Sequence, residues 1–186
     1  MTNDFENAPG ESIDTEIKLV SMVAPVYNEE ANLTDLIKRC VAVGDALECE
    51  YELVLVDDGS ADSSAQMIQQ AADEYQGRVI GVLLNRNYGQ HAAVMAGLAQ
   101  SRGDVVVTLD ADLQNPPEEI PTLLEKSKQG CDVVGSVRMN RKDTFFRRTA
   151  SKITNKAVQK ATGVIMTDSG CSVRAYCTTL VNAMLK

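Results

Sequence analysis

The chain has 186 residues, of which 44% are hydrophobic and 24% are charged, as expected of one globular domain with a substantial core. Its formal net charge of −8 argues against general nucleic-acid binding. No apolar run reaches the roughly 18 residues of a membrane span, and the acidic N-terminus lacks the apolar stretch of a secretory signal.

Residues 1–17 are predicted to form a disordered acidic leader, and residues 18–186 to form one domain. Within that domain, continuous apolar runs alternate with stretches of helical periodicity. The predicted strands are Leu19–Ala24, Leu53–Val56, Val79–Leu84, Val105–Leu109 and Asp132–Val137. The predicted helices lie between them and begin near Asn32, Ser63, Gly89 and Pro117. This order predicts an α/β fold, a Rossmann-like and mostly parallel sheet with helices on both faces.

The cysteines are odd in number, five in all, and form no CxxC pair. In a chain without an export signal this pattern favours free thiols in a reducing cytosol. A zinc site is not expected, because His91 is the only histidine.

Polar motifs follow three of the predicted strands. They are Tyr27-Asn28-Glu29, Asp57-Asp58-Gly59-Ser60 and Asp110-Ala111-Asp112. Ligands of open α/β sheets bind at the carboxyl ends of the strands. The three motifs are therefore predicted to form one site.

The third motif has the residues of a metal site. Asp110 and Asp112 can converge on one hard cation just past a strand end, and Gln114 offers a further oxygen. Oxygen ligands suit Mg²⁺ or Mn²⁺, which would bridge a diphosphate and neutralise it as a leaving group. An isolated pair of this kind is also explained by solvated or helix-capping aspartates.

The second motif has two interpretations. The carboxylates of Asp57 and Asp58 could accept from a uracil N–H or from ribose hydroxyls, and a turn with helix capping by Asp62 or Ser63 explains the same residues. The chain has no glycine-rich phosphate-binding motif. Phosphate binding would then depend on a metal and on side chains.

Residues 138–160 carry eight Lys and Arg against one acidic residue, Asp143, in an otherwise acidic chain. A helix from Phe146 would set Arg148, Lys152 and Lys156 on one face. A basic amphipathic helix can bind the anionic headgroups of a membrane surface, although a solvated helix face is the ordinary alternative.

Three segments of the chain together resemble the motifs of the inverting family-2 glycosyltransferases, which have the GT-A fold. They are Pro25–Glu29, Val56–Ser60 and Leu109–Gln114. Asp110–Pro117 is similar to the polyprenyl-phosphate glycosyltransferases within that family. Leu84–His91 and Gly170–Tyr176 resemble those members that transfer 4-deoxy-4-formamido-L-arabinose to undecaprenyl phosphate for lipid A modification. The resemblance extends from Lys18 to the C-terminus.

The resemblance implies a role for each matching position. The nucleotide would be held by Pro25, Tyr27, Glu29 and either Asp57 or Asp58. The metal and the diphosphate would be held by Asp110, Asp112 and Gln114. The acceptor phosphate would be held by Arg138, Arg147 and Ser151, with Asp168 near the sugar. Asp112, Arg138 and Asp168 are thus the predicted catalytic residues.

The implied reaction moves a sugar from a UDP-sugar to polyprenyl phosphate, with inversion at the anomeric carbon. A phosphate monoester is largely dianionic at neutral pH, so it needs little help from a general base. The implied place is the cytoplasmic face of the bacterial inner membrane. Such relatives continue into transmembrane helices beyond the position of Lys186, so we expect a soluble catalytic domain without its membrane region.

Other interpretations stay open. The sugar could be glucose, mannose or N-acetylglucosamine, or the chain could bind a nucleotide-sugar without catalysing transfer. A phosphoacceptor receiver places its paired acids after the first strand, whereas a strand and a helix precede Asp57-Asp58 here. A haloacid-dehalogenase-type phosphatase has its DxD in the first strand, with Thr or Val two residues after the second Asp, whereas here Gln114 is in that position, after the fourth strand. The choice between Mg²⁺ and Mn²⁺, the oligomeric state and any general base are likewise open.

Overall fold

The computed structural model describes residues 16–135 and 173–186. The predicted leader, except for its last two residues, lies outside this part. So do the basic segment 138–160 and Asp168. Ile17, which the prediction placed in the leader, is buried in the core, so the folded domain includes this residue. No helix in the described ranges has the length and apolar character needed to cross a membrane.

Six strands form one sheet in the order β3-β2-β1-β4-β6-β5. Their bounds are β1 Leu19–Val26, β2 Glu50–Asp57, β3 Val79–Leu83, β4 Val105–Thr108, β5 Val133–Gly135 and β6 Arg174–Cys177. Strands β1 to β4 are parallel to one another, and β6 runs antiparallel to both β4 and β5. The mostly parallel sheet is therefore confirmed, and β6 is a strand that the apolar pattern did not reveal.

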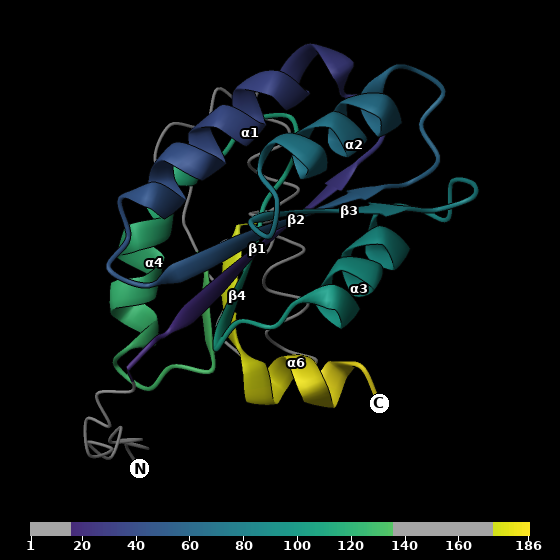
Figure 1. Cartoon of the computed structure of the whole chain (residues 1–186). Coiled ribbons are helices and arrows are strands. Elements are labelled where there is room, and N and C mark those ends of the chain that lie inside the picture. The colour runs from purple at the N-terminus through teal and green to yellow at the C-terminus, as the bar shows by residue number, and fades with distance from the viewer. Residues whose placement is uncertain (1–15, 136–172) are drawn as a thin grey trace, which may run out of the picture.

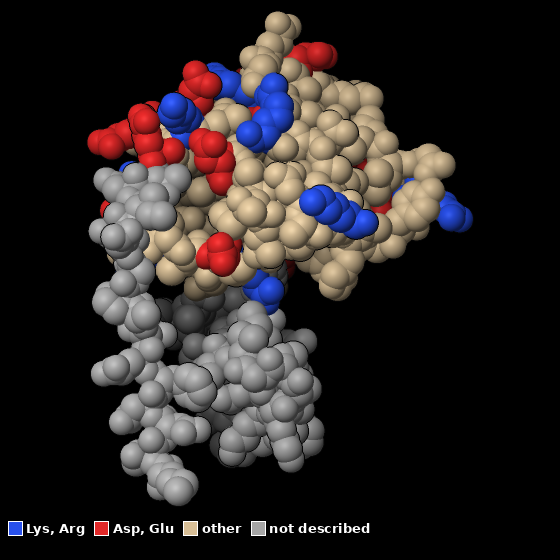
Figure 2. All heavy atoms as spheres, turned by 90° about the horizontal axis from the view of Figure 1, so that it is seen from below, with Lys and Arg blue, Asp and Glu red and all other residues tan. Residues whose placement is uncertain are grey.

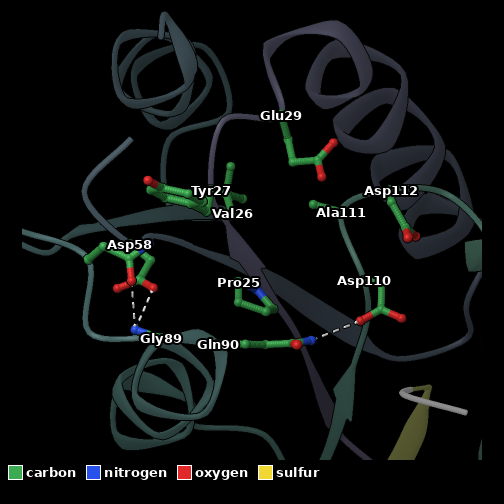
Figure 3. A pocket seen from close by; sticks show the side chains of 11 residues that line it. Pro25, Val26, Tyr27, Glu29, Asp58, Gly89, Gln90, Asp110, Ala111 and Asp112 are labelled. Carbon is green, nitrogen blue, oxygen red and sulfur yellow. Dashed lines mark hydrogen bonds between the residues drawn. The ribbon is translucent and has the colours of Figure 1, made fainter. Parts of the chain in front are cut away.

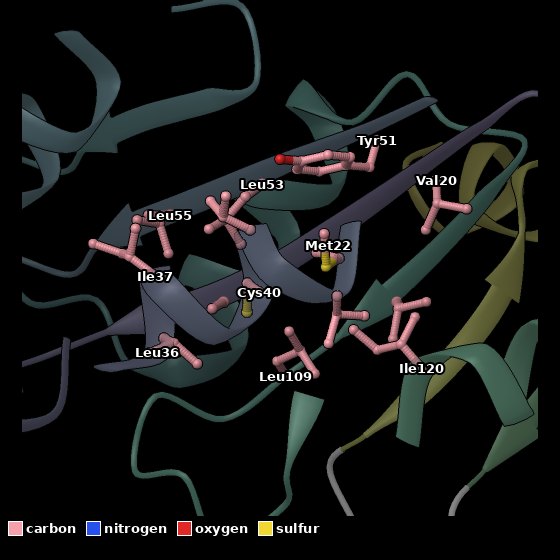
Figure 4. Packing of buried hydrophobic residues seen from close by; sticks show 14 of the residues in the cluster. Val20, Met22, Leu36, Ile37, Cys40, Tyr51, Leu53, Leu55, Leu109 and Ile120 are labelled. Carbon is pink, nitrogen blue, oxygen red and sulfur yellow. The ribbon is translucent and has the colours of Figure 1, made fainter. Parts of the chain in front are cut away.

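Helices cover both faces of the sheet (Figure 1), as predicted. On one face lie α1 (Glu30–Asp45), α2 (Ser64–Glu74), the 3₁₀ turn η1 (Pro117–Glu119) and α4 (Ile120–Ser127). On the other lie α3 (Gln90–Gln100) and α6 (Thr178–Met184). Each layer has its own apolar cluster: Leu53 and Leu55 of β2 pack under α1 (Figure 4), and Val54 and Val56 face α3.

Helix α1 begins earlier than predicted. Its first residue is Glu30 and its N-cap is Glu29, so the predicted start near Asn32 lies too late in the chain. The Asn32 Nδ2 atom donates instead to Glu29 Oε2 at 2.8 Å. This contact holds the Glu29 side chain beside the end of β1.

The far end of α3 is fixed by a buried carboxylate. Glu52 of β2 is 1% exposed and accepts hydrogen bonds from Ser21 Oγ (2.6 Å), the Arg102 backbone N–H (2.7 Å) and the Arg102 guanidinium (2.6 and 2.8 Å). Ser21 Oγ in turn accepts from the Gly103 N–H at 2.8 Å. The segment between α3 and β4 is thereby tied to the centre of the sheet.

The four cysteines in the described ranges, Cys40, Cys49, Cys131 and Cys177, are all free thiols, as predicted. Burial raises the pKa of Cys40 to about 12. Seen from the side of α3 and α6, the described surface carries separate basic side chains and no continuous basic patch (Figure 2).

Candidate active site

A cavity of about 390 Å³ opens at the carboxyl ends of β1, β2 and β4 (Figure 3). The register aligns Val26 of β1 with Asp57 of β2, so Tyr27 and Asp58 leave the sheet side by side. The lining residues are Pro25, Val26, Tyr27, Glu29, Asp58, Asn87, Gly89, Gln90, Asp110, Ala111 and Asp112. The predicted meeting of the three motifs at one edge of the sheet is confirmed.

Asp110 and Asp112 follow β4 in a tight turn. Asp110 accepts from Gln90 Nε2 at 3.2 Å and from Asn115 Nδ2 at 3.4 Å. Asp112 is exposed and accepts from the Gln114 backbone N–H at 3.0 Å, which closes a turn through Leu113 at φ 57°. A left-handed leucine costs about 1–2 kcal/mol, so the surrounding contacts must hold this turn in place.

The donor set of the cavity fits a divalent cation that is shared with a ligand. The described residues contain no group of three Asp, Glu, His or Cys side chains that could hold a metal by themselves. Mg²⁺, however, is commonly bound by one or two carboxylates together with substrate phosphates and water. Asp110 and Asp112 meet that requirement, whereas Gln114 is exposed and does not line the cavity.

The charged side chains that line the described part of the cavity are all acidic. Four carboxylates line it, those of Glu29, Asp58, Asp110 and Asp112, and none of the lining residues in the described part of the chain is Lys or Arg. An anionic ligand would be repelled by these walls. A bound cation would reverse that balance.

Asp57 and Asp58 differ in position, although both are buried. Asp57 accepts from the Ser60 N–H at 3.2 and 3.3 Å and does not line the cavity. Asp58 lines it, and its two oxygens accept from the backbone N–H groups of Tyr88 (2.8 Å) and Gly89 (2.9 Å). Of the two alternatives for a nucleotide contact, the geometry therefore favours Asp58.

The loops after β1 and β2 are joined by their own polar groups. Asn28, at φ 54°, donates its backbone N–H to Ser60 Oγ (2.9 Å) and accepts from the Ala61 N–H (2.8 Å). Asp62 accepts from the backbone N–H groups of Glu30 and Ser64. Desolvation opposes ionisation of Asp62, but hydrogen bonds with the Ser64 side chain and with the Ser64 and Glu30 backbones outweigh it and lower the pKa of its carboxyl. Ser60 and Asp62 thus hold the loop after β2 against the loop after β1, at the edge of the cavity.

The segment from Leu84 to Gly89 packs on the turn at Gly59, which has φ 70°. A Cβ on Gly59 would lie 2.4 Å from the Arg86 carbonyl carbon. We expect Gly59→Ala to lower the free energy of unfolding by about 2–4 kcal/mol, from left-handed strain and this overlap. Gly77→Ala is the matched control, because Gly77 has φ 79° but no atom within 4 Å of an added Cβ. In urea unfolding the two variants should differ by about 1–3 kcal/mol, and equal losses would contradict the close packing.

The remaining predicted residues fall into two groups. Pro25, Tyr27 and Glu29 line the cavity, and Tyr27 is 48% exposed. Arg138, Arg147, Ser151 and Asp168 lie outside the described residues. Sequence reasoning did not assign roles to Asn87, Gly89 and Gln90, which form a wall of the cavity. The sequence signal that could have indicated this wall was the position of Gly89, at the start of a predicted helix that follows a strand.

Comparisons with known proteins agree on one family. The sequence profile described as "Glycosyl transferase family 2" matches residues 21–185. A relative from Aeromonas hydrophila subsp. hydrophila, named undecaprenyl-phosphate 4-deoxy-4-formamido-L-arabinose transferase, is 59% identical over 92% of this chain and 53% of its own length. A relative of the same name from Pseudomonas fluorescens (strain SBW25) is 59% identical over 91% of this chain and 50% of its own length. The chain thus spans about half the length of these curated relatives.

Solved structures show a similar arrangement of the chain. Glucosyl-3-phosphoglycerate synthase from Mycobacterium tuberculosis, in complex with UDP, has a TM-score of 0.65 at 25% identity and covers 88% of this chain and 58% of its own. A mannosyltransferase from Pyrobaculum calidifontis, in complex with GDP-Man and Mn²⁺, has a TM-score of 0.64 at 21% identity and covers 92% and 48%. The second likeness bears on the fold alone.

Proposed function

The chain belongs to glycosyl transferase family 2 and has the GT-A fold, and from this premise we propose that it is the donor-binding part of a sugar transferase. The donor is a UDP-sugar, and the acceptor in the complete protein is undecaprenyl phosphate. The observation that carries the proposal is the cavity at the strand ends, which is lined by Asp110 and Asp112 on the β4 side and by the buried Asp58 on the β2 side.

The nucleotide would lie across the ends of β1 and β2. The exposed Tyr27 ring offers a face on which a base can stack, and Asp58 lines the same cavity with its carboxylate. The M. tuberculosis relative of known structure binds UDP, which supports uracil as the base. Glu29 would accept from ribose hydroxyls at the start of α1.

The diphosphate would lie toward β4, beside Asp110 and Asp112. These carboxylates repel a diphosphate unless a divalent cation lies between them, so the proposal requires metal-dependent donor binding. The residues fit Mg²⁺ and Mn²⁺ equally. When bound, the cation would stabilise negative charge on the departing diphosphate.

The acceptor is proposed from the names of the relatives, which specify undecaprenyl phosphate and 4-deoxy-4-formamido-L-arabinose. An acceptor phosphate oxygen would form a bond to the anomeric carbon as the bond to the UDP oxygen breaks, which inverts the configuration. Arg138, Arg147 and Ser151 would hold that phosphate through charge-assisted hydrogen bonds, with Asp168 near the sugar. Glucose, mannose and N-acetylglucosamine remain the competing sugars.

The place of action follows from the acceptor. A polyprenyl phosphate resides in a membrane, and the basic segment 138–160 would hold the domain against the anionic lipids of the cytoplasmic face. The chain alone would bind the donor, and the complete protein would catalyse transfer.

Calorimetric titration of the chain with UDP in the presence of Mn²⁺ tests the donor site. EDTA should weaken binding at least about 100-fold, because a bound cation contributes several kcal/mol toward a diphosphate in a carboxylate-lined cavity. GDP is the matched control for the base. UDP binding that is unaffected by EDTA, or its absence in a chain shown to be folded, would refute the proposed donor site.

A further inference from the structure

Hydrogen bonds connect the two ends of the cavity through Gly89 and Gln90, two wall residues to which the sequence motifs assigned no role. At the β2 end, Asp58 accepts from the N–H groups of Tyr88 and Gly89, at 2.8 and 2.9 Å. At the β4 end, Gln90 Nε2 donates to Asp110 Oδ1 at 3.2 Å (Figure 3). Gly89 and Gln90 are adjacent in the chain. The contacts therefore run without interruption from Asp58 to Asp110.

The backbone places Gln90 for this contact. Gly89 has φ 94° and caps α3, so the chain turns directly from the Asp58 contact into the first helical residue, which is Gln90. Arg86 and Asn87 pack on Gly59, which fixes the preceding part of the segment. The Gln90 side chain then reaches Asp110 across the cavity mouth, and both residues line the cavity.

We propose that Gln90 is a positioning residue, which holds Asp110 in the rotamer that binds the divalent cation. The inference rests on the proposed function, since it assigns how one metal-binding carboxylate of that site is oriented. Donors that hydrogen-bond a ligating group fix its orientation, and their loss typically costs 10- to 100-fold in metal affinity. Here the amide donates to Oδ1 of Asp110 and leaves the other lone pair of that oxygen available to the cation.

Electrostatics gives the contact a second effect. Asp110 shares the cavity with three other carboxylates, those of Glu29, Asp58 and Asp112. Mutual repulsion favours rotamers that turn these groups apart. A neutral amide donor counters this tendency at Asp110 without adding a charge that would compete with the cation. The role fits glutamine, whereas lysine at this position would compete for the carboxylate.

A structural role for Gln90 predicts something different. If the contact served only to fasten α3 to β4, its loss would lower the thermal stability and leave the affinity for a cation unchanged. Gln90 is exposed and lies at the start of its helix. Such a residue contributes little to global stability, so the two roles are separable in one variant.

The test is a titration of Mn²⁺ into the chain with UDP present, followed by electron paramagnetic resonance of free Mn²⁺. Gln90→Met keeps the length of the side chain and removes the amide donor. Gln100→Met is the matched control, because Gln100 is an exposed glutamine at the other end of α3 and does not line the cavity. We expect Mn²⁺ affinity about tenfold weaker in Gln90→Met, unchanged in Gln100→Met, and a melting temperature within about 2 °C of the parent chain for both.

Two outcomes overturn the inference. One is Mn²⁺ affinity in Gln90→Met that equals that of the parent chain. The other is an affinity loss that Gln100→Met shares or that accompanies a fall in melting temperature. Failure of the parent chain itself to bind Mn²⁺ with UDP would refute the proposed function instead, so the two failures are distinguishable.

Discussion

An Asp112→Ala variant is expected to lose metal-dependent UDP binding and, in the complete protein, to transfer sugar at least about 1,000-fold more slowly. Asp110 and Asp112 are the two carboxylates that the turn after β4 presents to the cavity, so the substitution removes one of the two side chains proposed to bind the cation. A thousandfold loss corresponds to about 4 kcal/mol of transition-state stabilisation, which matches the several kcal/mol that a bound cation supplies.

The loss should be functional and not structural. Asp112 is exposed, and its one described contact in the turn is with the Gln114 N–H, so the free energy of unfolding should change by less than about 1 kcal/mol. Asp73→Ala on α2 is a suitable control, because Asp73 is also exposed but does not line the cavity. Turnover like that of the unaltered protein in Asp112→Ala would exclude the proposed role of this carboxylate.

The site could be predicted from the sequence wherever it depends on parallel strands. The carboxyl ends of β1, β2 and β4 meet at one edge by the topology of an α/β sheet, so Tyr27, Asp58 and Asp110 had to approach one another. The position of Gln90 follows from no such rule. It depends on the path of a polar loop without periodicity, which is set by tertiary contacts to Gly59 and Asp58.

The alternation of side chains along a strand could have indicated which of Asp57 and Asp58 lines the cavity. In β2, Leu53 and Leu55 face α1, whereas Val54 and Val56 face α3. Continuing this alternation puts Asp58 on the side of α3, where it meets the N–H groups that precede that helix. Strand β6, by contrast, could not be anticipated, because Arg174–Cys177 is a short mixed-polarity segment whose pairing with β4 is set by the rest of the fold.

The largest expected effect on stability lies away from the cavity, at Glu52. Its buried carboxylate accepts from Ser21, from the Arg102 backbone and from the Arg102 guanidinium. Removing the carboxylate would leave the buried Ser21 hydroxyl without this 2.6 Å acceptor and would open space between β2 and the segment before β4. An unsatisfied buried polar group costs about 1–3 kcal/mol, and the emptied space adds a loss of packing, so the two effects together give about 3–5 kcal/mol.

Glu52→Ala should therefore lower the free energy of unfolding by about 3–5 kcal/mol in urea denaturation, and the melting temperature by about 10 °C. Glu50→Ala is the matched control, since Glu50 lies on the same strand but is exposed, and it should change stability by less than about 0.5 kcal/mol. The Arg102 side chain, which pairs with Glu52, is 65% exposed, so water can solvate its guanidinium after the substitution. A loss below about 1 kcal/mol in Glu52→Ala would mean that water replaces the carboxylate, and that α3 is held by its apolar face alone.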